Sequence, residues 1–439
     1  MSTDPRPSWN PASSAPNGPG CHVPGQDNRA EDEVLALGPD LDSGSGALDW
    51  ALLRELQGAI SHPSVSILLG TNPGAQMTSL DVSRLHPLAT RARLRLQREV
   101  RGDQLSSLEE RLARAVDLAQ SSASHEGLAV LVSARHMMVV RLPFEPRDRA
   151  VVDPTFATRD LLVAVQCFPR YRLLALGSDH PRILEGRARH LVEVTATATD
   201  PDQTGSFPRA LPGPGGARRY PERWIPDLAR RRAALNAAEH DLDQRVAHAG
   251  HLPLVVVASP RLLVEFAASS RHARSLVGQV RGNHRQASAG DLGDLVQPAL
   301  AAWRADQVRN QLRSLETADR TGSVVWGLHQ SWEAANEGRA QHLWVDQQYA
   351  VPARLSDAGK VLHVIADPET VNANDDVVDE LIEMVAAMRR PVDIVPWLSA
   401  AYPAGVAVEL VGAFSDNNRH KLQEGREQAQ LGHASGRPA

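Results

Sequence analysis

The sequence predicts an α/β protein built from several domains. Short apolar runs bounded by glycine or proline, such as residues 65–69 and 252–258, alternate with longer segments of helical periodicity. At 439 residues the chain is too long for one hydrophobic core, and its hydrophobic content of 42% is enough to fill more than one. We therefore expect separate α/β units along a single chain.

Composition argues against several classes of protein. No run approaches the roughly 18 apolar residues of a membrane helix, and the N-terminus lacks a charged segment followed by an apolar one. Cys21 and Cys167 lie in unrelated settings, so neither a disulfide framework nor a zinc cluster is expected. The net charge of -5 argues against a generally basic nucleic-acid coat. We expect a cytoplasmic protein with no membrane partner.

The first domain is expected at residues 48–160, after a disordered tail at 1–47 that is rich in proline, serine and glycine. Asp49 suits the N-cap of a helix whose apolar positions begin at Trp50. The other expected elements are a strand at 65–69, helices at 81–100 and 106–120, and strands at 127–132 and 137–140.

The second domain is expected at residues 165–315. Its expected elements are strands at 171–177, 182–186 and 190–195, a helix at 226–249, a strand at 252–258 and a helix at 291–315. The first five follow the β-β-β-α-β order of an RNase-H-like sheet.

The third domain is expected at residues 320–415, before a disordered tail at 416–439. Its expected elements are helices at 322–336 and 375–388, and strands at 341–345, 361–365, 392–396 and 407–411. This alternation predicts a three-layer α/β/α domain.

The segment most suggestive of function is the loop at 200–220, between an expected strand and the long helix of the second domain. Its glycine and proline residues prevent regular structure and allow the backbone to approach another surface closely. The guanidinium groups that follow suit phosphates, and the aromatic rings suit exposed bases. The candidate RNA-binding residues are Gly215, Gly216, Ala217, Arg218, Arg219, Tyr220 and Arg223.

A simpler interpretation of the loop also stands. It could be a flexible surface loop before a solvated helix face, on which Arg230 to Arg232 pair with Glu239 or Asp243. Composition alone favours this interpretation. A second basic stretch at 271–285 suits phosphate binding and a solvated helix end equally well, and a third at 84–101 reads as a solvent face.

Motifs for common enzyme chemistry are absent from the sequence, which contains no HExxH, GxSxG, Walker A or GxGxxG pattern in a suitable context. An RNase-H-like nuclease needs several carboxylates around two metal ions, and the core strands at 173–176 and 255–257 carry none. His248 and His251 flank Gly250 in a way more typical of surface histidines than of metal ligands. We expect no catalytic residue, no metal and no cofactor.

Three parts of the chain share a pattern with one known family. They comprise 61–67 (SHPSVSI), Thr71, Asp81, Arg84 and Leu85, the strand pair at 171–186, and 338–343 with the helix containing Asp379, Glu380 and Leu381 and the final strand. In these parts the chain resembles bacterial relatives of the archaeal and eukaryotic class-1 peptide-chain release factors. The resemblance covers most of residues 50–415 and implies a three-domain release-factor-like architecture with a ribosomal-protein-like third domain. The chain departs from the family's usual opening at Leu68 and Gly70, where tyrosine and proline are usual.

In that family a Gly-Gly-Gln tripeptide, on the loop before the long helix of the middle domain, promotes hydrolysis of peptidyl-tRNA. Here the same place holds Gly215-Gly216-Ala217, and Ala217 has no side-chain amide to orient a water. The resemblance implies a ribosome-associated factor that binds rRNA and occupies the tRNA A site, in hibernation or rescue, without peptide release. A non-enzymatic role is therefore favoured. Two alternatives stay open: a stress-related protein-interaction adaptor, and a hydrolase of peptidyl-tRNA.

Overall fold

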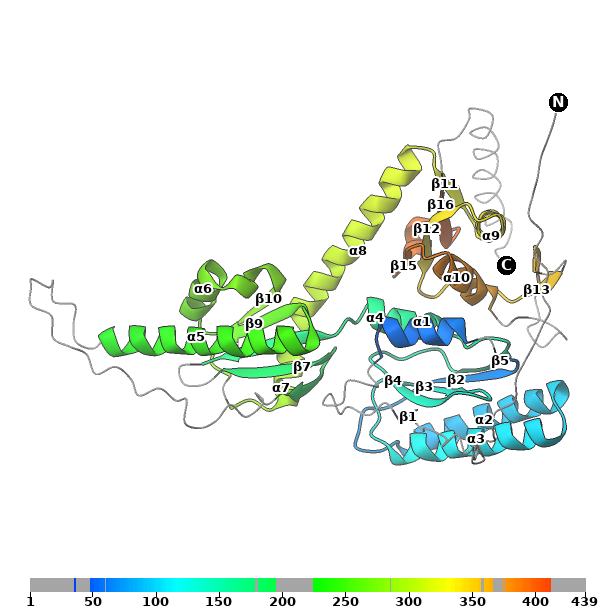
Figure 1. The fold of residues 1–439 in the computed structure, drawn as a ribbon, viewed down its shortest axis with the longest axis horizontal. Helices are drawn as coiled ribbons and strands as arrows, with labels where there is room; N and C mark the ends of the chain where they lie inside the picture. The colour runs from blue at the N-terminus through cyan, green and yellow to red at the C-terminus, as the bar shows by residue number, and fades with distance from the viewer. Residues whose placement is uncertain are drawn as a thin grey trace, which may run out of the picture. The chain divides into compact units, whose positions relative to one another are not determined.

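The computed structural model describes residues 35–36, 48–59, 61–177, 181–194, 224–284, 286–356, 359–365, 374 and 376–411. They all belong to one compact unit that begins at Leu35. Three sheets, each formed by its own stretch of chain, and a separate two-stranded hairpin are surrounded by helices (Figure 1). The predicted mixed α/β class is confirmed, while the limits of the three domains stay predictions.

The first sheet has the strand order β1-β4-β3-β2-β5, antiparallel except for the β1–β4 pair. Residues 35–36, expected in a disordered tail, instead form β1. The rest of that tail, residues 1–34 and 37–47, and the tail expected at 416–439 lie outside the described residues. Asp49 caps α1 as expected, since its carboxylate accepts from the amides of Ala51 and Leu52. The elements are β1 (Leu35–Ala36), α1 (Trp50–Gly58), β2 (Ser64–Gly70), α2 (Ser79–Glu99), α3 (Gly102–Ser121), β3 (Gly127–Val132), β4 (Met137–Leu142), β5 (Arg149–Asp153) and α4 (Arg159–Gln166).

Side-chain alternation along β2 explains why helices cover both faces of this sheet. Val65, Ile67 and Leu69 pack with α2 and α3, whereas Leu68 belongs to the core shared with α1 and α4. All seven residues of β2 are buried, as expected for a central strand with both faces covered.

The second sheet has the order β10-β9-β6-β7-β8 and contains the predicted β-β-β-α-β succession. Two expectations were wrong. The helix expected at 291–315 is two helices, because the chain turns at Val296 before Pro298. Residues 276–281, read as part of a basic surface stretch, form the edge strand β10, parallel to β9. The elements are β6 (Tyr171–Leu176), β7 (Arg182–Arg187), β8 (His190–Glu193), α5 (Trp224–Ala249), β9 (Leu254–Ala258), α6 (Pro260–Ser269), the 3-10 helix η2 (Arg271–Ser275), β10 (Leu276–Arg281), α7 (Ala289–Leu295) and α8 (Gln297–Arg320).

The third sheet has the order β11-β16-β12-β15 and lies between two helical layers. Helices α9 and α10 cover one face, and α11 with the end of α8 covers the other, which agrees with the expected α/β/α layering. The helix expected at 322–336 is instead strand β11 followed by α9, because Gly327 turns the chain at a φ of 88°. The elements are β11 (Val324–Trp326), α9 (Leu328–Asn336), β12 (Ala340–Asp346), β13 (Ala353–Ser356), β14 (Val361–Val364), α10 (Val377–Ala387), β15 (Val392–Val395), α11 (Leu398–Ala401) and β16 (Val406–Leu410).

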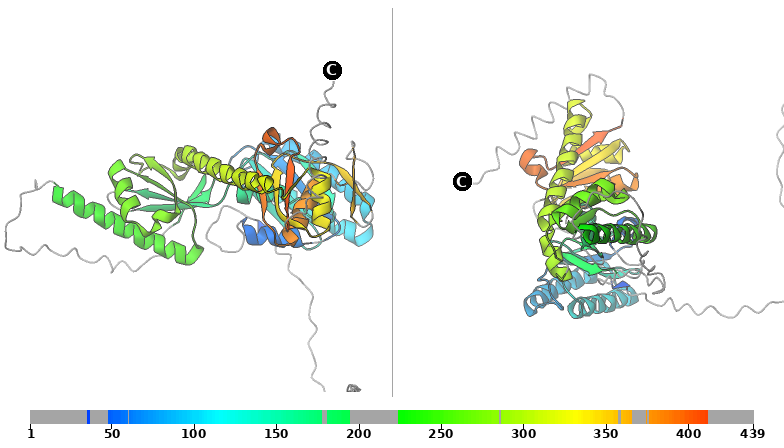
Figure 2. Two further views of the ribbon diagram at one scale, coloured as in Figure 1. Left: turned by 90° about the horizontal axis from the view of Figure 1, so that it is seen from above. Right: turned by 90° about the vertical axis from the view of Figure 1, so that its left-hand side faces the viewer.

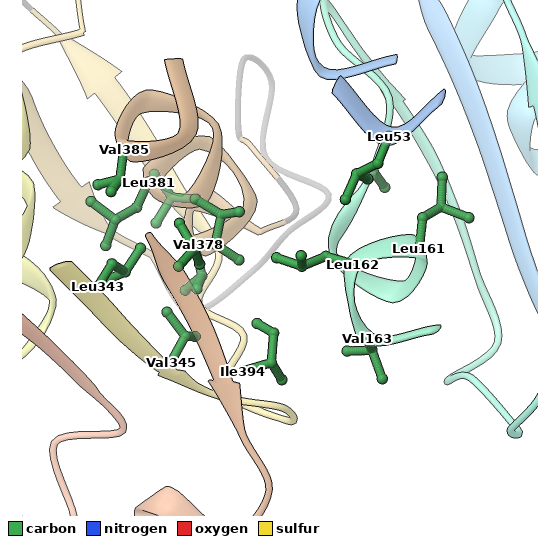
Figure 3. Close-up of a cluster of buried hydrophobic side chains, with 14 of the residues drawn as sticks. Leu53, Leu161, Leu162, Val163, Leu343, Val345, Val378, Leu381, Val385 and Ile394 are labelled. Carbon is green, nitrogen blue, oxygen red and sulfur yellow. The ribbon is translucent and has the colours of Figure 1, made fainter. Parts of the chain in front are cut away.

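Two helices connect the sheets. Helix α8, the yellow-green helix in Figure 2, runs from the second sheet to the third. Its Leu300 belongs to the core of the second sheet and its Leu315 to a core of the third. Helix α4 contributes to one hydrophobic core together with the first and third sheets, and Leu162 points toward Val378 and Ile394 (Figure 3). The short α4 was not predicted from the sequence.

Polar contacts fix both ends of α4. At its start, the buried Arg159 guanidinium pairs with Asp376 and donates to the carbonyl oxygen of Tyr349. At its end, the Gln166 side chain donates to the Val392 carbonyl (2.7 Å) and accepts from the Ile394 amide (2.6 Å) on β15.

The second sheet reaches α4 through Arg187, at the end of β7. Its guanidinium donates to the carbonyl oxygens of Ala164 (3.0 Å), Phe168 (2.6 Å) and Leu48. Burial lowers the pKa of Arg187 to about 10. Carbonyl oxygens near the C-terminal end of α4 hold the group, where the helix dipole favours a positive charge.

A buried ion pair lies between neighbouring strands of the second sheet. Arg172 on β6 and Glu185 on β7 are 2% and 1% exposed, and their nitrogen and oxygen atoms approach to 2.6 Å. Arg170 contacts the second carboxylate oxygen of Glu185, also at 2.6 Å. Both oxygens of this carboxylate are thus paired with guanidinium groups.

Replacing Glu185 with glutamine is expected to lower the free energy of unfolding by about 3–5 kcal/mol, because the Arg172 guanidinium would stay buried without a counter-charge. Urea unfolding followed by circular dichroism measures the loss. Glu193→Gln is the control: this residue pairs with Arg182 but its side chain is 45% exposed, so the loss should be below about 1 kcal/mol. Equal losses in the two variants would contradict the assignment.

Helix α5 packs on the second sheet through small side chains. Ala234 and Ala238 are 1% and 0% exposed, and Leu242 continues the same face. Alanine at the contact lets the helix backbone lie close to the sheet, where a longer side chain would not fit without displacement.

Ala234→Leu is expected to lower the free energy of unfolding by about 1–3 kcal/mol, because the added atoms overpack the contact between α5 and the sheet. Ala233→Leu, one position earlier on the exposed side of the helix, should change it by no more than about 0.5 kcal/mol. Thermal and urea unfolding of both variants test the orientation of α5; the reverse order would show that the other face is packed.

Candidate nucleic-acid interface

The loop singled out in the sequence connects β8 to α5. Its candidate residues Gly215, Gly216, Ala217, Arg218, Arg219, Tyr220 and Arg223 all lie outside the described residues, so their contacts stay predictions. The structure describes strand β8, from which the loop departs, and helix α5, to which it returns.

Strand β8 anchors the departing end of the loop in the sheet. The turn from β7 to β8 is tight, and a Cβ atom on Gly186 would lie 1.8 Å from the carbonyl oxygen of His190. The amide of Val194 donates to the carbonyl of Ile183 at 2.9 Å, which extends the pairing to the last residue described before the loop. The point of departure is therefore fixed by backbone hydrogen bonds.

The returning end of the loop is α5, which ion pairs hold at two levels. Nearer its start, Arg231 Nε lies 3.4 Å from a carboxylate oxygen of Glu265 on α6. Further along, Glu239 and Asp243, one turn apart, each lie 3.1 Å from the Arg271 guanidinium on η2. These contacts add directional constraints to the apolar packing of the helix.

His272 reinforces the second level. It is 7% exposed, and its Nε2 lies 3.0 Å from Asp243 Oδ1. The Ser270 hydroxyl accepts from the His272 amide at 3.0 Å and so fixes the backbone at the start of η2. The basic stretch at 271–285 thus contributes Arg271 and His272 to holding α5, a role that neither the phosphate-binding nor the solvated-helix-end interpretation of the stretch included.

The simpler interpretation expected Arg230 to Arg232 to pair with Glu239 or Asp243, and for Arg231 this expectation is wrong. Glu239 and Asp243 pair with Arg271, and Arg231 pairs with Glu265. Arg232 is exposed on α5 and forms no ion pair with any other residue that the structure describes.

Arg274 and Arg281 are also exposed and lack ion-pair partners within the described ranges. Together with Arg232, they are exposed guanidinium groups on α5, η2 and β10 that can form bidentate hydrogen bonds with phosphate oxygens. In the basic stretch at 84–101, by contrast, Arg84 pairs with Asp148 at 2.7 Å.

The described residues offer little for metal chemistry. Between residues 35 and 411, leaving aside the gaps in the description, no group of three or more His, Cys, Asp or Glu side chains could hold a metal ion. Glu185 is buried in the second sheet, but Arg170 and Arg172 occupy its oxygens. No helix of the described chain is both long and apolar enough to cross a membrane.

The contacts that hold α5 were missed in the sequence because they join distant segments. The available signal was the i, i+4 spacing of Glu239 and Asp243, which places two carboxylates on one helix face. That spacing predicts a cationic partner without indicating which one. Arg271 is hard to foresee as that partner because β9 and α6 separate it from α5 along the chain.

Comparisons with known structures reveal likenesses at low identity. An archaeal translation termination factor, aRF1, is 16% identical, with 86% of this chain and 99% of that chain covered and a TM-score of 0.23. A model of ribosome-bound archaeal Pelota and ABCE1 contains a chain that is 10% identical, with 84% and 95% covered and a TM-score of 0.35. Archaeoglobus fulgidus Pelota is 12% identical, with 65% and 78% covered and a TM-score of 0.31.

The comparison with family models is more specific. No curated protein matches the chain. Residues 170–339 match the model of bacterial archaeo-eukaryotic release factor family 3. The matched range contains the whole second sheet, the helix α5 and the loop between β8 and α5. Over residues 170–339 the chain is therefore similar to the bacterial archaeo-eukaryotic release factors of family 3.

Proposed function

We propose that this chain is a ribosome-associated factor that occupies the tRNA A site without releasing the peptide. The observation that carries the proposal is the family match over residues 170–339, which includes Gly215-Gly216-Ala217 between β8 and α5. Two glycines followed by Arg218 and Arg219 combine an unhindered backbone with cations for rRNA phosphates.

Ala217 is the reason for proposing occupancy in place of catalysis. In the release factors that the chain resembles, the third residue of this tripeptide is glutamine. The methyl group of Ala217 can neither donate nor accept a hydrogen bond, so it cannot position a water against the ester of peptidyl-tRNA. Docking without hydrolysis suits hibernation or rescue, in the cytoplasm, with rRNA as the principal partner and further protein partners allowed.

Alanine at both Arg218 and Arg219 is expected to weaken binding to 70S ribosomes, because two guanidinium contacts to phosphates are lost. Co-sedimentation through sucrose gradients at low and physiological salt measures the binding. The parent should bind less at the higher salt, and the double variant should show a shallower salt dependence. No binding at either salt would overturn the ribosome proposal and favour the protein-interaction adaptor.

A matched control variant distinguishes the effect of the loop arginines on binding from the effect of net charge. Arg93 and Arg98 are exposed on α2, and replacing both with alanine changes the charge by the same amount. This control should keep the binding of the parent. If it weakens binding equally, attraction depends on overall charge and not on the loop.

Ala217→Gln is expected to confer peptide release on the docked protein, because it restores the missing amide. Release of the peptide from peptidyl-tRNA on 70S ribosomes measures this, with Ala217→Leu as a control that enlarges the side chain without an amide. Release by the parent itself would contradict the proposal and favour the hydrolase alternative. Binding without any gain would show that the tripeptide is not positioned at the ester.

A further inference from the structure

Helix α10 presents four carboxylates on one face. They belong to its N-cap Asp376 and to Asp379, Glu380 and Glu383, spaced three, one and three residues apart. Residues three or four apart are neighbours on a helix surface, so Asp376 and Glu383 each lie next to both Asp379 and Glu380. All four side chains are at least partly buried, Asp376 and Asp379 being 9% and 13% exposed.

The cations within reach are too few for these carboxylates. From α4, Arg159 pairs with Asp376, and its Nε lies 3.4 Å from Asp379 Oδ1. Arg149 on β5 acts on the cluster from further away, but it pairs with Asp160 at 2.5 Å. One guanidinium therefore directly faces several carboxylates, and Asp160 adds a further acidic group on the α4 side.

Hydrogen bonding separates the four carboxylates into two kinds. Asp376 accepts from the amides of Val351 (3.2 Å) and Val378 (3.1 Å) in addition to its ion pair, and these contacts oppose the rise of its pKa that burial causes. Asp379 Oδ1 is buried and accepts no hydrogen bond from the residues described.

The two glutamates have only neutral partners. Glu383 Oε1 accepts from the hydroxyl of Thr158, the N-cap of α4, at 3.5 Å, and Glu380 Oε1 accepts from the side-chain amide of Asn374 at 3.4 Å. Neither donor carries a positive charge to balance an ionised carboxylate that is buried beside its acidic neighbours.

The protonation of these groups follows from that environment. The pKa of Glu383 is raised to about 9, mainly by burial and in addition by the neighbouring charges of Glu380 and Asp379. Burial also raises the pKa of Asp379 to about 7, despite the opposing effect of Arg159. For Glu380 the pKa is likewise raised by burial.

We propose that the contact between α4 and α10 takes up protons when it forms, so that the first and third sheets are held together more tightly in acid than in alkali. Without this contact the carboxylates of α10 are hydrated and ionise in their ordinary range. With the contact formed, Glu383 keeps a proton at neutral pH. This proposal is independent of ribosome binding.

The direction of the pH effect follows from linkage. A carboxyl group whose pKa is raised in the closed state favours closing fully below its ordinary pKa, and the advantage is lost as pH rises toward the raised value. For each proton taken up, the closing equilibrium should fall about tenfold per pH unit. The window extends from the ordinary value of 4.5 to about 9 for Glu383.

Hydrogen exchange at the Ile394 amide tests the proposal in the full chain. This amide donates to Gln166 Oε1, so its exchange reports separation of α4 from β15. After correction for the intrinsic exchange rate, protection in the wild type should fall about a hundredfold or more between pH 6 and pH 8. Protection that is constant or that rises over this interval would overturn the proposal, without needing any variant.

Glu383→Gln tests which group takes up the proton, because the amide cannot ionise. In this variant the fall of protection with pH should be weaker than in the wild type, by about a factor of ten for each pH unit. Glu333→Gln, on the exposed side of α9, removes an equal charge and should keep the wild-type dependence. A wild-type slope in Glu383→Gln would overturn the role of Glu383. If that variant does not fold, the pH dependence of the urea midpoint of the wild type still decides the sign.

Discussion

The fold depends on how the short helix α4 is held. An isolated helix of eight residues is not stable in water, so its stability must come from packing. Seven of its residues are buried, and its polar ends contact α10 through Arg159, β15 through Gln166 and β7 through Arg187. These elements belong to different sheets, and α4 itself follows the first one. The helix therefore derives its stability from the elements that it joins.

The guanidinium groups of two arginines at α4, Arg159 and Arg187, are satisfied in different ways. Arg159 lies against carboxylates, whereas Arg187 is surrounded by carbonyl oxygens, including that of Ala164 near the C-terminal end of the helix. Ion pairs in such places add little net stability, because removing both charges from water is costly. Their geometry is directional, however, since a guanidinium group satisfied by fixed acceptors tolerates few orientations. Orientation between elements is the property that these contacts provide.

The sequence predicted what local patterns determine and missed what distant contacts determine. The cap at Asp49 and the apolar run at 65–69 each carry their own signal, and both were placed correctly. Helix α4 was missed because a short apolar run can be strand or helix, and only packing decides between them. Strand β10 was missed because Arg271 and Arg274 precede it and suggested a solvated surface. For the candidate loop, the sequence could assign its place between β8 and α5, whereas the partners of Arg231 required the structure.

Gln166 has a consequence for the behaviour of the chain among other proteins. Its side-chain amide offers β15 one donor and one acceptor, which is what the backbone of an adjacent strand would offer. Strand β15 is the last in its sheet, so Gln166 occupies part of an otherwise unpaired strand edge. If α4 moves away, Val392 and Ile394 expose backbone groups that can pair with an extended segment of another molecule. Closure of this contact thus also protects the molecule from edge-to-edge association.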